Sequence, residues 1–186
     1  MLLSVLQYVI EDTILNKLEC ITIMKTLLLL RHANASSTNN PSLSDYKRPL
    51  TYQGKRDARI IGKFLRNKKL IPDMIVSSIA LRAVETTKLI AKDINYKNEI
   101  DLSELLYQTN VRDYINVISK ISDENNVVLL VGHNPILEDL VEIITNELKI
   151  IKTCSLVHIA LPVNSWIELE TKIKGKLIEQ FDISNL

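Results

Sequence analysis

The sequence predicts a single α/β domain in which a mostly parallel central sheet is flanked by helices, in three layers. Two short apolar runs, 25–30 and 127–131, are typical of buried strands. Segments with helical periodicity lie between them, and alternating strands and helices favour a parallel sheet. The chain has 186 residues, 46% of them hydrophobic and 24% charged, which fits one ordinary globular domain.

The first half of the chain is predicted to hold two strands and two helices. In order, we expect a strand at 25–30, a loop at 33–50, a helix from Thr51 to about residue 67, a strand at 74–76 and a helix at 80–93. Thr51 is a favourable N-cap, because its hydroxyl can accept a hydrogen bond from a free N–H of the first turn. Loops as long as 33–50 are usually functional in a compact domain.

The second half is predicted to continue the alternation and to end in antiparallel strands. In order, we expect a short strand and loop over 99–107, a helix over 111–122, a strand over 127–131, a helix of about 11 residues, and a hairpin or meander from about residue 155. Asn134 and Pro135 form a favourable helix start, as N-cap and first helical residue. The alternating segments LVHIAL and WIELE predict the antiparallel strands.

The N-terminal residues 1–23 are treated as an appendage to a domain over 24–186. Apolar residues at helical spacing in this segment are compatible with an amphipathic helix, and an alternative is that translation starts at Met24. No basic residue precedes the apolar run 2–10, so it does not fit a secretory signal. The run is also much shorter than the ~20 residues of a membrane-spanning helix.

Composition and cysteine spacing exclude several classes of function. With 23 basic and 22 acidic residues the net charge is +1, which argues against a nucleic-acid binder. The two cysteines, Cys20 and Cys154, form no CxxC pair, so we expect reduced thiols in a cytoplasmic protein. No glycine-rich phosphate loop and no cluster of metal-ligand spacing are present, so no cofactor and no metal is expected.

Polar clusters follow three of the predicted strands at the point where each strand ends. These clusters are Arg31-His32, Ser77-Ser78 and Gly132-His133-Asn134. Parallel sheets bind ligands beyond the carboxyl ends of their strands, so we expect the clusters to form one site. Arg31 and Arg82 offer paired donors that match phosphate oxygens, and an imidazole nitrogen can attack phosphorus. Together with His32 and His133 they indicate a phosphoryl-transfer site that needs no metal.

Five segments, in the same order, resemble the signatures of the histidine phosphatase superfamily. They are LLLLRHANA, DYKRPLTYQGKRDA, VSSIALRAVETT, SELLY and LLVGHNP, within residues 24–170. The RHA form and the D-x-x-R-P-L-T-x-x-G element are similar to the small SixA-like phosphohistidine phosphatases. The resemblance implies a phosphoglycerate mutase-like fold, with His32 as the phosphorylated nucleophile. Arg31, Arg82 and His133 would complete the phosphate pocket.

The resemblance also suggests roles for residues around the pocket. Glu104 falls where larger members of the family place their general acid, although SixA-like proteins vary at this position. Three polar residues are expected at the pocket rim as substrate contacts: Asn34, Ser78 and Asn134. Arg48 is interpreted as structural, anchoring the loop through Asp45.

The predicted function is that of a metal-independent phosphatase with a covalent phosphohistidine intermediate. The expected substrate is a phosphohistidine on a protein, such as a histidine phosphotransfer domain, because no large insertion would close the pocket to a protein side chain. One alternative is a broad small-molecule phosphomonoesterase acting on small phosphoesters. The alternative from another class is a non-catalytic phospho-binding module, against which the presence of both histidines and both arginines argues.

Overall fold

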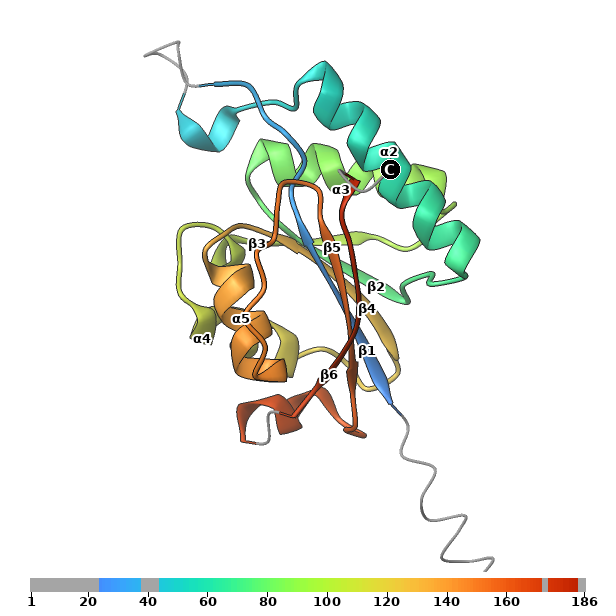
Figure 1. The fold of residues 1–186 in the computed structure, drawn as a ribbon, viewed down its shortest axis with the longest axis vertical. Helices are drawn as coiled ribbons and strands as arrows, with labels where there is room; N and C mark the ends of the chain where they lie inside the picture. The colour runs from blue at the N-terminus through green and yellow to red at the C-terminus, as the bar shows by residue number, and fades with distance from the viewer. Residues whose placement is uncertain (1–23, 38–43, 172–173, 184–186) are drawn as a thin grey trace, which may run out of the picture.

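The computed structural model of the chain describes residues 24–37, 44–171 and 174–183. The expectations for 1–23, an amphipathic helix or a start at Met24, lie outside these residues. Six strands form one sheet in the order β3-β2-β4-β1-β5-β6 (Figure 1). The first four strands of that order run parallel, and β5 and β6 are antiparallel additions at one edge. The single α/β domain with a mostly parallel sheet is therefore confirmed.

The helices and strands follow one another much as the sequence predicts. The strands are β1 (Lys25–Arg31), β2 (Met74–Ser78), β3 (Ile100–Ser103), β4 (Val127–Gly132), β5 (Leu156–Leu161) and β6 (Lys176–Phe181). The α-helices are α2 (Tyr52–Lys68), α3 (Leu81–Asp93), α4 (Val111–Ser119) and α5 (Ile136–Thr145). Within the described residues, three short 3-10 helices complete the set: η1 (Asp45–Lys47), η2 (Glu104–Leu106) and η3 (Trp166–Glu170).

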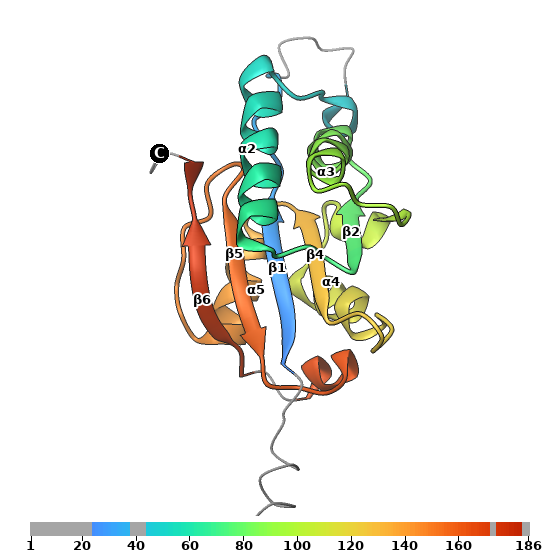
Figure 2. The ribbon, with the colours of Figure 1, turned by 90° about the vertical axis from the view of Figure 1, so that its right-hand side faces the viewer.

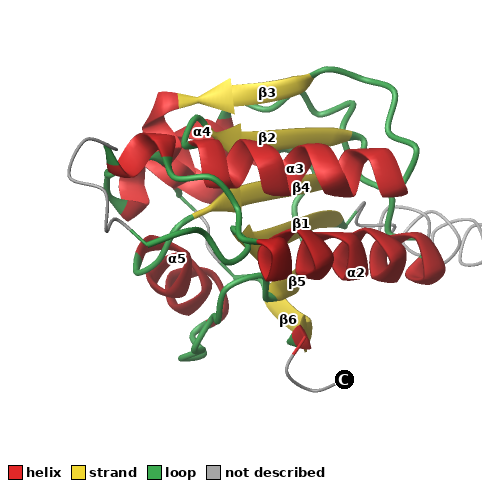
Figure 3. Cartoon of the chain, turned by 90° about the horizontal axis from the view of Figure 1, so that it is seen from above, coloured by secondary structure: helices red, strands yellow, loops and turns green. Residues whose placement is uncertain are grey.

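The two faces of the sheet are covered by different pairs of helices, which gives three layers. Successive side chains of a strand point to opposite faces. Leu28 and Leu30 of β1 accordingly pack in the core shared with α2 and α3, whereas Leu27 and Leu29 pack in the core shared with α4 and α5. Figure 2 shows α2 and α3 in front of the sheet, and Figure 3 shows α4 and α5 beside the strand ends. Burial on both faces explains why the four leucines of β1, 27–30, follow one another without alternating with polar residues.

Connections from two neighbouring strands leave the sheet toward opposite faces. The chain passes from β1 to α2 on one face, and from β4 to α5 on the other. Because β1 and β4 are adjacent and parallel, their carboxyl ends form the crevice in which such sheets bind ligands. The fold thus places Arg31-His32 and His133 side by side.

Local sequence signals determine where several elements begin and end. The Thr51 hydroxyl accepts a hydrogen bond from the Gly54 N–H (2.9 Å), which confirms the predicted N-cap of α2. Helix α5 begins one residue later than predicted, at Ile136, and Asn134 is not its N-cap. The Asn134 amide instead donates to Glu138 and to the Ile151 carbonyl, so tertiary contacts displace the expected cap.

Two further predictions of secondary structure need correction. Helix α4 ends at Ser119 rather than near residue 122. The segment WIELE is not a strand but the 3-10 helix η3, because Ser165 and Glu168 form a capping box at its start. The antiparallel partner of β5 is β6, which comes after η3 in the chain. In the described part of the chain, no helix is both long and apolar enough to cross a membrane.

Candidate active site

The carboxyl ends of β1 and β4 bring two histidines together. Arg31 is paired with Gly132 in the sheet, and the His32 N–H donates to the Gly132 carbonyl (3.1 Å). The next residues along each strand, His32 and His133, therefore leave the sheet at the same level. Their imidazole centroids lie 5.0 Å apart with the rings tilted by 53°. The pairing of two adjacent parallel strands is thus sufficient to bring the two imidazole rings together.

The His32 imidazole is held in the form that can act as a nucleophile. Its Nδ1 lies 2.8 Å from the Ala33 carbonyl oxygen, which can only accept, so Nδ1 carries the proton. Its Nε2 accepts from Arg82 Nε (3.2 Å) and thus presents a lone pair. Burial lowers the pKa of His32 to about 4, and the positive charges of Arg82 and Arg31 contribute to the lowering. His32 is therefore neutral at physiological pH.

Arg82 lies in the first turn of α3, directly behind the end of β2, and is only 7% exposed. One edge of its guanidinium, formed by Nε and Nη2, faces the histidines, with Nη2 3.4 Å from His133 Nδ1. The end of the guanidinium, formed by Nη1 and Nη2, donates to Asp45, to its carbonyl oxygen (2.8 Å) and to its carboxylate (3.0 Å). The edge that can pair with a phosphate thus faces His32.

The His133 ring is supported from two sides. Ser78 Oγ lies 2.8 Å from His133 Nε2 and accepts from the Ala80 N–H, which fixes the ring orientation and leaves Nδ1 toward Arg82. The His133 N–H donates to the Tyr114 hydroxyl (3.1 Å). A Cβ on Gly132 would lie 2.4 Å from that hydroxyl, so glycine is required for this approach. Burial, together with the neighbouring His32 and Arg82, lowers the pKa of His133 to about 3.

These side chains line a cavity of about 320 Å³ at the carboxyl ends of the strands. The cavity is lined by Arg31, His32, Asp45, Arg82, Tyr107, Gln108, Thr109, His133, Asn134, Pro135 and Ile136. Arg31 donates from Nη1 to the Ile151 carbonyl (2.8 Å), but its Nε is buried and has no hydrogen-bond partner among the described residues. Buried donors without partners are costly, and a bound anion would supply the missing acceptor.

Three of the residues expected at the site lie outside this cavity. Glu104 is exposed at the start of η2. Asn34 is also exposed, and its backbone carbonyl accepts from Thr51 at the start of α2. Ser78 is fully buried behind His133, so it supports the ring rather than forming the rim. Asn134 does line the cavity, with its amide engaged by Glu138 and Ile151.

Sequence reasoning missed the contribution of Asp45 and Tyr107 to the cavity. The expected ion pair of Asp45 with Arg48 is present (2.9 Å), but the same carboxylate also accepts from Arg82 and from the Tyr107 hydroxyl (3.0 Å). Both residues belong to recognised segments, DYKRPL and SELLY, which was the available signal. Arg82 lies 37 positions from Asp45 in the sequence, and Tyr107 lies 62 positions from it. Local sequence patterns do not predict contacts over such separations.

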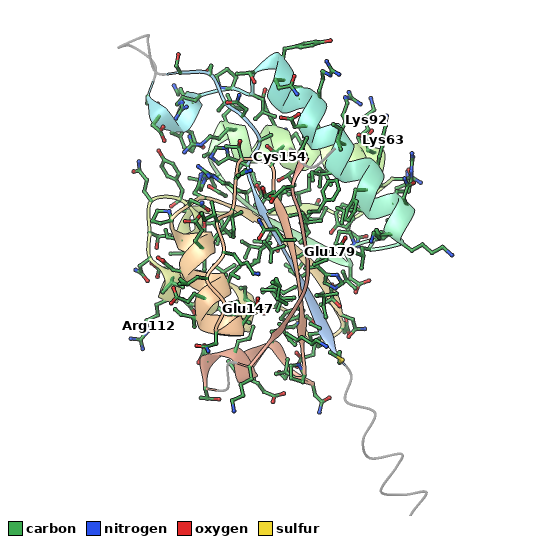
Figure 4. All side chains as sticks on the ribbon, viewed as in Figure 1. Lys63, Lys92, Arg112, Glu147, Cys154 and Glu179 are labelled. Atoms are coloured by element: carbon green, nitrogen blue, oxygen red, sulfur yellow. The ribbon has the colours of Figure 1, made fainter. Side chains whose placement is uncertain are left out.

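Cys154, labelled in Figure 4, supports the end of β1 from the neighbouring chain segment. Its N–H is shared between the carbonyl oxygens of Arg31 and His32 (3.1 Å each). The thiol is free and buried, and burial raises its pKa. A protonated buried thiol is a poor nucleophile, which leaves His32 as the nucleophilic side chain best placed in the cavity. Among the described residues, no group of three or more His, Cys, Asp or Glu is placed to hold a metal ion.

Comparison with known proteins identifies the family. Residues 27–114 match the family model of the histidine phosphatase superfamily, branch 1. An uncharacterised chloroplast protein of Arabidopsis thaliana is 30% identical over 156 residues, which cover 79% of this chain and 71% of that protein. The chain belongs to the histidine phosphatase superfamily. Within that superfamily it is SixA-like, and the family supports a phosphatase, a hydrolase of phosphoryl groups.

Solved structures of several phosphatases share the fold. A chain from Agrobacterium tumefaciens assigned as the phosphohistidine phosphatase SixA is 26% identical, with a TM-score of 0.71 over 85% of this chain and 97% of that chain. The protein histidine phosphatase SixA complexed with tungstate has a TM-score of 0.74 at 21% identity, over 86% and 98% of the two chains. A mycobacterial glucosyl-3-phosphoglycerate phosphatase superposes with a TM-score of 0.61 at 13% identity, over 83% and 97%. The phosphoglycerate mutase-like fold is thus common to neighbours that bear different names.

Proposed function

We propose that this histidine phosphatase hydrolyses phosphohistidine on a protein, without a metal, through a phosphoryl group held covalently on His32. The observation that carries the proposal is the state of His32, a neutral ring with a proton on Nδ1 and a lone pair on Nε2 beside Arg82. Arg31, Arg82 and His133 surround the space in front of that lone pair. Their donors match the oxygens of one phosphoryl group.

In the first step the Nε2 lone pair attacks phosphorus and forms a P–N bond. The bond from phosphorus to the leaving atom breaks, and its electron pair stays with that atom. Charge on the equatorial oxygens is stabilised by Arg82 through its Nε and Nη2 edge, by Arg31 and by His133. The Nδ1 hydrogen bond to Ala33 holds the ring in line throughout.

In the second step water attacks the phosphoryl group on His32. The P–Nε2 bond breaks, its electron pair returns to Nε2, and both water protons leave with the phosphate. His32 is restored in the neutral form that its surroundings favour. Splitting the reaction into two displacements at phosphorus is the usual advantage of a covalent intermediate.

A phosphohistidine substrate is favoured over an ester by the carboxylates around the site. An alkoxide leaving group needs a proton from a general acid, and the carboxyl group suggested for this role, Glu104, lies outside the cavity. A phosphoramidate nitrogen can be protonated before the bond breaks, so it needs no such donor. A phosphotransfer protein of a signalling relay would present this group on its surface. SixA, a protein histidine phosphatase, is among the structural neighbours.

The covalent step is tested by trapping the intermediate on full-length protein. After brief reaction with a radiolabelled phosphohistidine peptide, we expect alkaline denaturation to preserve label on His32 and proteolytic mapping to locate it there. His32→Gln should lose the label, whereas His158→Gln should keep it, because His158 lies in β5 outside the cavity. Label on a serine or cysteine would contradict the mechanism, and a strict requirement for metal after EDTA treatment would contradict metal independence.

Substrate class is tested by turnover of a phosphorylated histidine protein beside a panel of small phosphoesters. We expect the highest kcat/KM on the phosphohistidine protein. A higher value on a small phosphoester would favour the phosphomonoesterase alternative. Stoichiometric binding of phosphate without turnover of either substrate would indicate a phospho-binding module.

A further inference from the structure

Asp45 is the only carboxylate among the described residues that line the active-site cavity. Its side chain is 37% exposed, whereas the side chain of Arg82 is only 8% exposed. Asp45 therefore lies on the solvent side of the cavity, and His32 and Arg82 lie deeper. A leaving group that departs in line, opposite His32, moves toward that solvent side.

Asp45 is held in place by three donors from three parts of the chain. Arg48 pairs with Oδ1 (2.9 Å), while Arg82 Nη2 and the Tyr107 hydroxyl both donate to Oδ2 (3.0 Å each). A carboxylate offers about four acceptor positions. With respect to the described residues, one position, on Oδ1, is therefore left for another donor. The contact with Arg82 uses the end of the guanidinium, so Asp45 does not occupy the edge that faces His32.

The surroundings of Asp45 keep its carboxylate ionised. Partial burial alone would raise its pKa, but the hydrogen bond from Arg48, the charge of Arg82 and the Tyr107 hydroxyl hold the pKa at about 2. At physiological pH Asp45 therefore has no proton to give to an alkoxide leaving group. It can accept a hydrogen bond from a leaving group that carries a proton and a positive charge.

We propose that Asp45 is a specificity-determining residue, which accepts a hydrogen bond from the protonated leaving group of a phosphohistidine and disfavours leaving groups that depart as anions. The inference rests on the proposed function, since it concerns the substrate class of the same site. Phosphohistidine bears phosphorus on one ring nitrogen and, when protonated, an N–H on the other. That N–H matches the open acceptor position of Asp45.

The step balances without another reactant. The His32 Nε2 lone pair forms the new bond to phosphorus, and the bond from phosphorus to the substrate ring breaks. Its electron pair returns to the substrate nitrogen, and the ring leaves as a neutral imidazole that keeps its proton on the far nitrogen. Without that proton, the ring would leave as an imidazolate anion. By stabilising the protonated ring, Asp45 keeps the substrate in the reactive form at higher pH.

The other charged and titratable groups that face Asp45 do not replace this role. They come from the same loop (Arg48), from α3 (Arg82), from the segment after η2 (Tyr107) and from the end of β4 (His133). Arg48 and Arg82 are cations and repel a protonated ring. His133 is neutral, because burial lowers its pKa to about 3. Among the described cavity residues, Asp45 is thus the one that attracts a cationic leaving group.

The test compares Asp45→Asn with wild type on two probes, a phosphohistidine peptide and 4-nitrophenyl phosphate, whose leaving group is an anion. Loss of the charge should lower kcat/KM for the peptide by about tenfold or more, since a nearby opposite charge shifts a pKa by about one to three units. Turnover of 4-nitrophenyl phosphate should fall by a smaller factor than turnover of the peptide, because Asp45 still holds Arg82 for both probes but meets a cationic leaving group only with the peptide. Asp101→Asn, the same change at an exposed position of β3, should alter neither value.

A pH profile gives a second readout that loss of structure would not produce. For the phosphohistidine peptide, the alkaline limb of kcat/KM should move to lower pH by about one unit or more in Asp45→Asn, and it should stay in place in Asp101→Asn. An equal loss on both probes would mean that Asp45 only orients Arg82, and no loss on the peptide would mean that it plays no part. Either result overturns the proposal. Labelling of His32 in the wild-type protein does not depend on either of these results for Asp45→Asn. The proposed function could therefore stand while this inference fails.

Discussion

Two cavities at opposite ends of the sheet differ in size and in chemistry. The larger, about 530 Å³, lies where the parallel strands begin, between β3 and α4, and the smaller, about 320 Å³, lies where they end. The larger is lined mainly by apolar and small polar residues: Met74, Val76, Ile100, Asp101, Leu102, Ser103, Val117, Lys120, Ile121, Ser122 and Asn125. The smaller is lined by two histidines and two arginines: Arg31, His32, Arg82 and His133. Volume alone would not choose the cavity with the histidines, since a third cavity, between α4 and the end of η3, is larger still at about 560 Å³.

The difference lies in how each end of the sheet is built. At the carboxyl ends, side chains from β1, α3 and the segment after β4 converge, and their burial lowers the pKa values of two histidines. Perturbed pKa values of this kind are typical of functional sites. The groove at the other end contains Asp101 and Lys120 but no histidine or arginine. Convergent charge in a partly dry space therefore distinguishes the site.

The largest expected effect is that of Arg82→Ala. This substitution removes the donors that face His32 and His133 and one of the three donors to the Asp45 carboxylate. We expect the transition state to be destabilised by about 3 kcal/mol, so that kcat falls more than a hundredfold. Arg112→Ala is the matched control, because Arg112 points away from the body of the domain on α4 (Figure 4). Steady-state kinetics measure both. Equal activity of the two variants would show that the arginine at the carboxyl ends of the strands contributes no more to turnover than an exposed arginine on α4.

The next effect is a shift in the acid limb of activity. Because burial lowers the pKa of His32 to about 4, the free enzyme keeps a neutral nucleophile down to about pH 5 and loses it as the pH falls through 4. A profile of kcat/KM against pH should therefore show its acid limb near 4 for a substrate that does not titrate there. A limb near the ordinary histidine value of 6.5 would show that the cavity does not desolvate His32.

Stability depends on the same histidines and must be measured in parallel. Their folded pKa values lie below the unfolded value of 6.5, so the unfolded state binds more protons between the two. The free energy of unfolding should therefore decrease as the pH falls from about 6.5 toward 4, as measured by circular dichroism. Kinetic points are used only where the protein remains folded.

A smaller effect is expected for Ser78→Ala. Loss of the hydroxyl behind His133 removes one hydrogen bond to the ring, worth about 1 kcal/mol, so kcat should fall about five- to tenfold. Ser119→Ala removes a comparable hydroxyl on α4, where it donates to Glu170 (2.8 Å), and should leave kcat unchanged. If both variants lose activity to the same extent, general destabilisation rather than ring orientation is the cause.

The smallest effect is expected for Glu104→Gln and for Lys120→Ala in the larger cavity. Both side chains are exposed and neither lines the active-site cavity, so kcat on a phosphohistidine peptide and on an aryl phosphate should stay within about twofold, the range of ordinary surface substitutions. A selective loss of ester hydrolysis in Glu104→Gln would instead support the general-acid role that the family resemblance suggests.

Local signals in the sequence were sufficient for most elements of the fold. The apolar runs of β1 and β4 reflect burial on both faces, and Thr51 marks the start of α2. Polar residues directly after strands predicted the meeting of His32 and His133, because parallel strands end at the same edge. The prediction for WIELE was wrong, since the capping box at Ser165 and the burial of Trp166 outweigh an alternating pattern.

By itself, the sequence determined the α/β architecture, the family and the cluster of His32, Arg82 and His133, because these depend on periodicity and on the residue types found directly after each strand. Only the tertiary structure decided the remaining roles. It placed Asp45 at the cavity and Glu104 outside it, and it buried Ser78 behind His133. The physical reason is that a loop carboxylate takes its partners from whatever elements pack around it. Here those partners come from α3 and from the segment after η2, far along the chain.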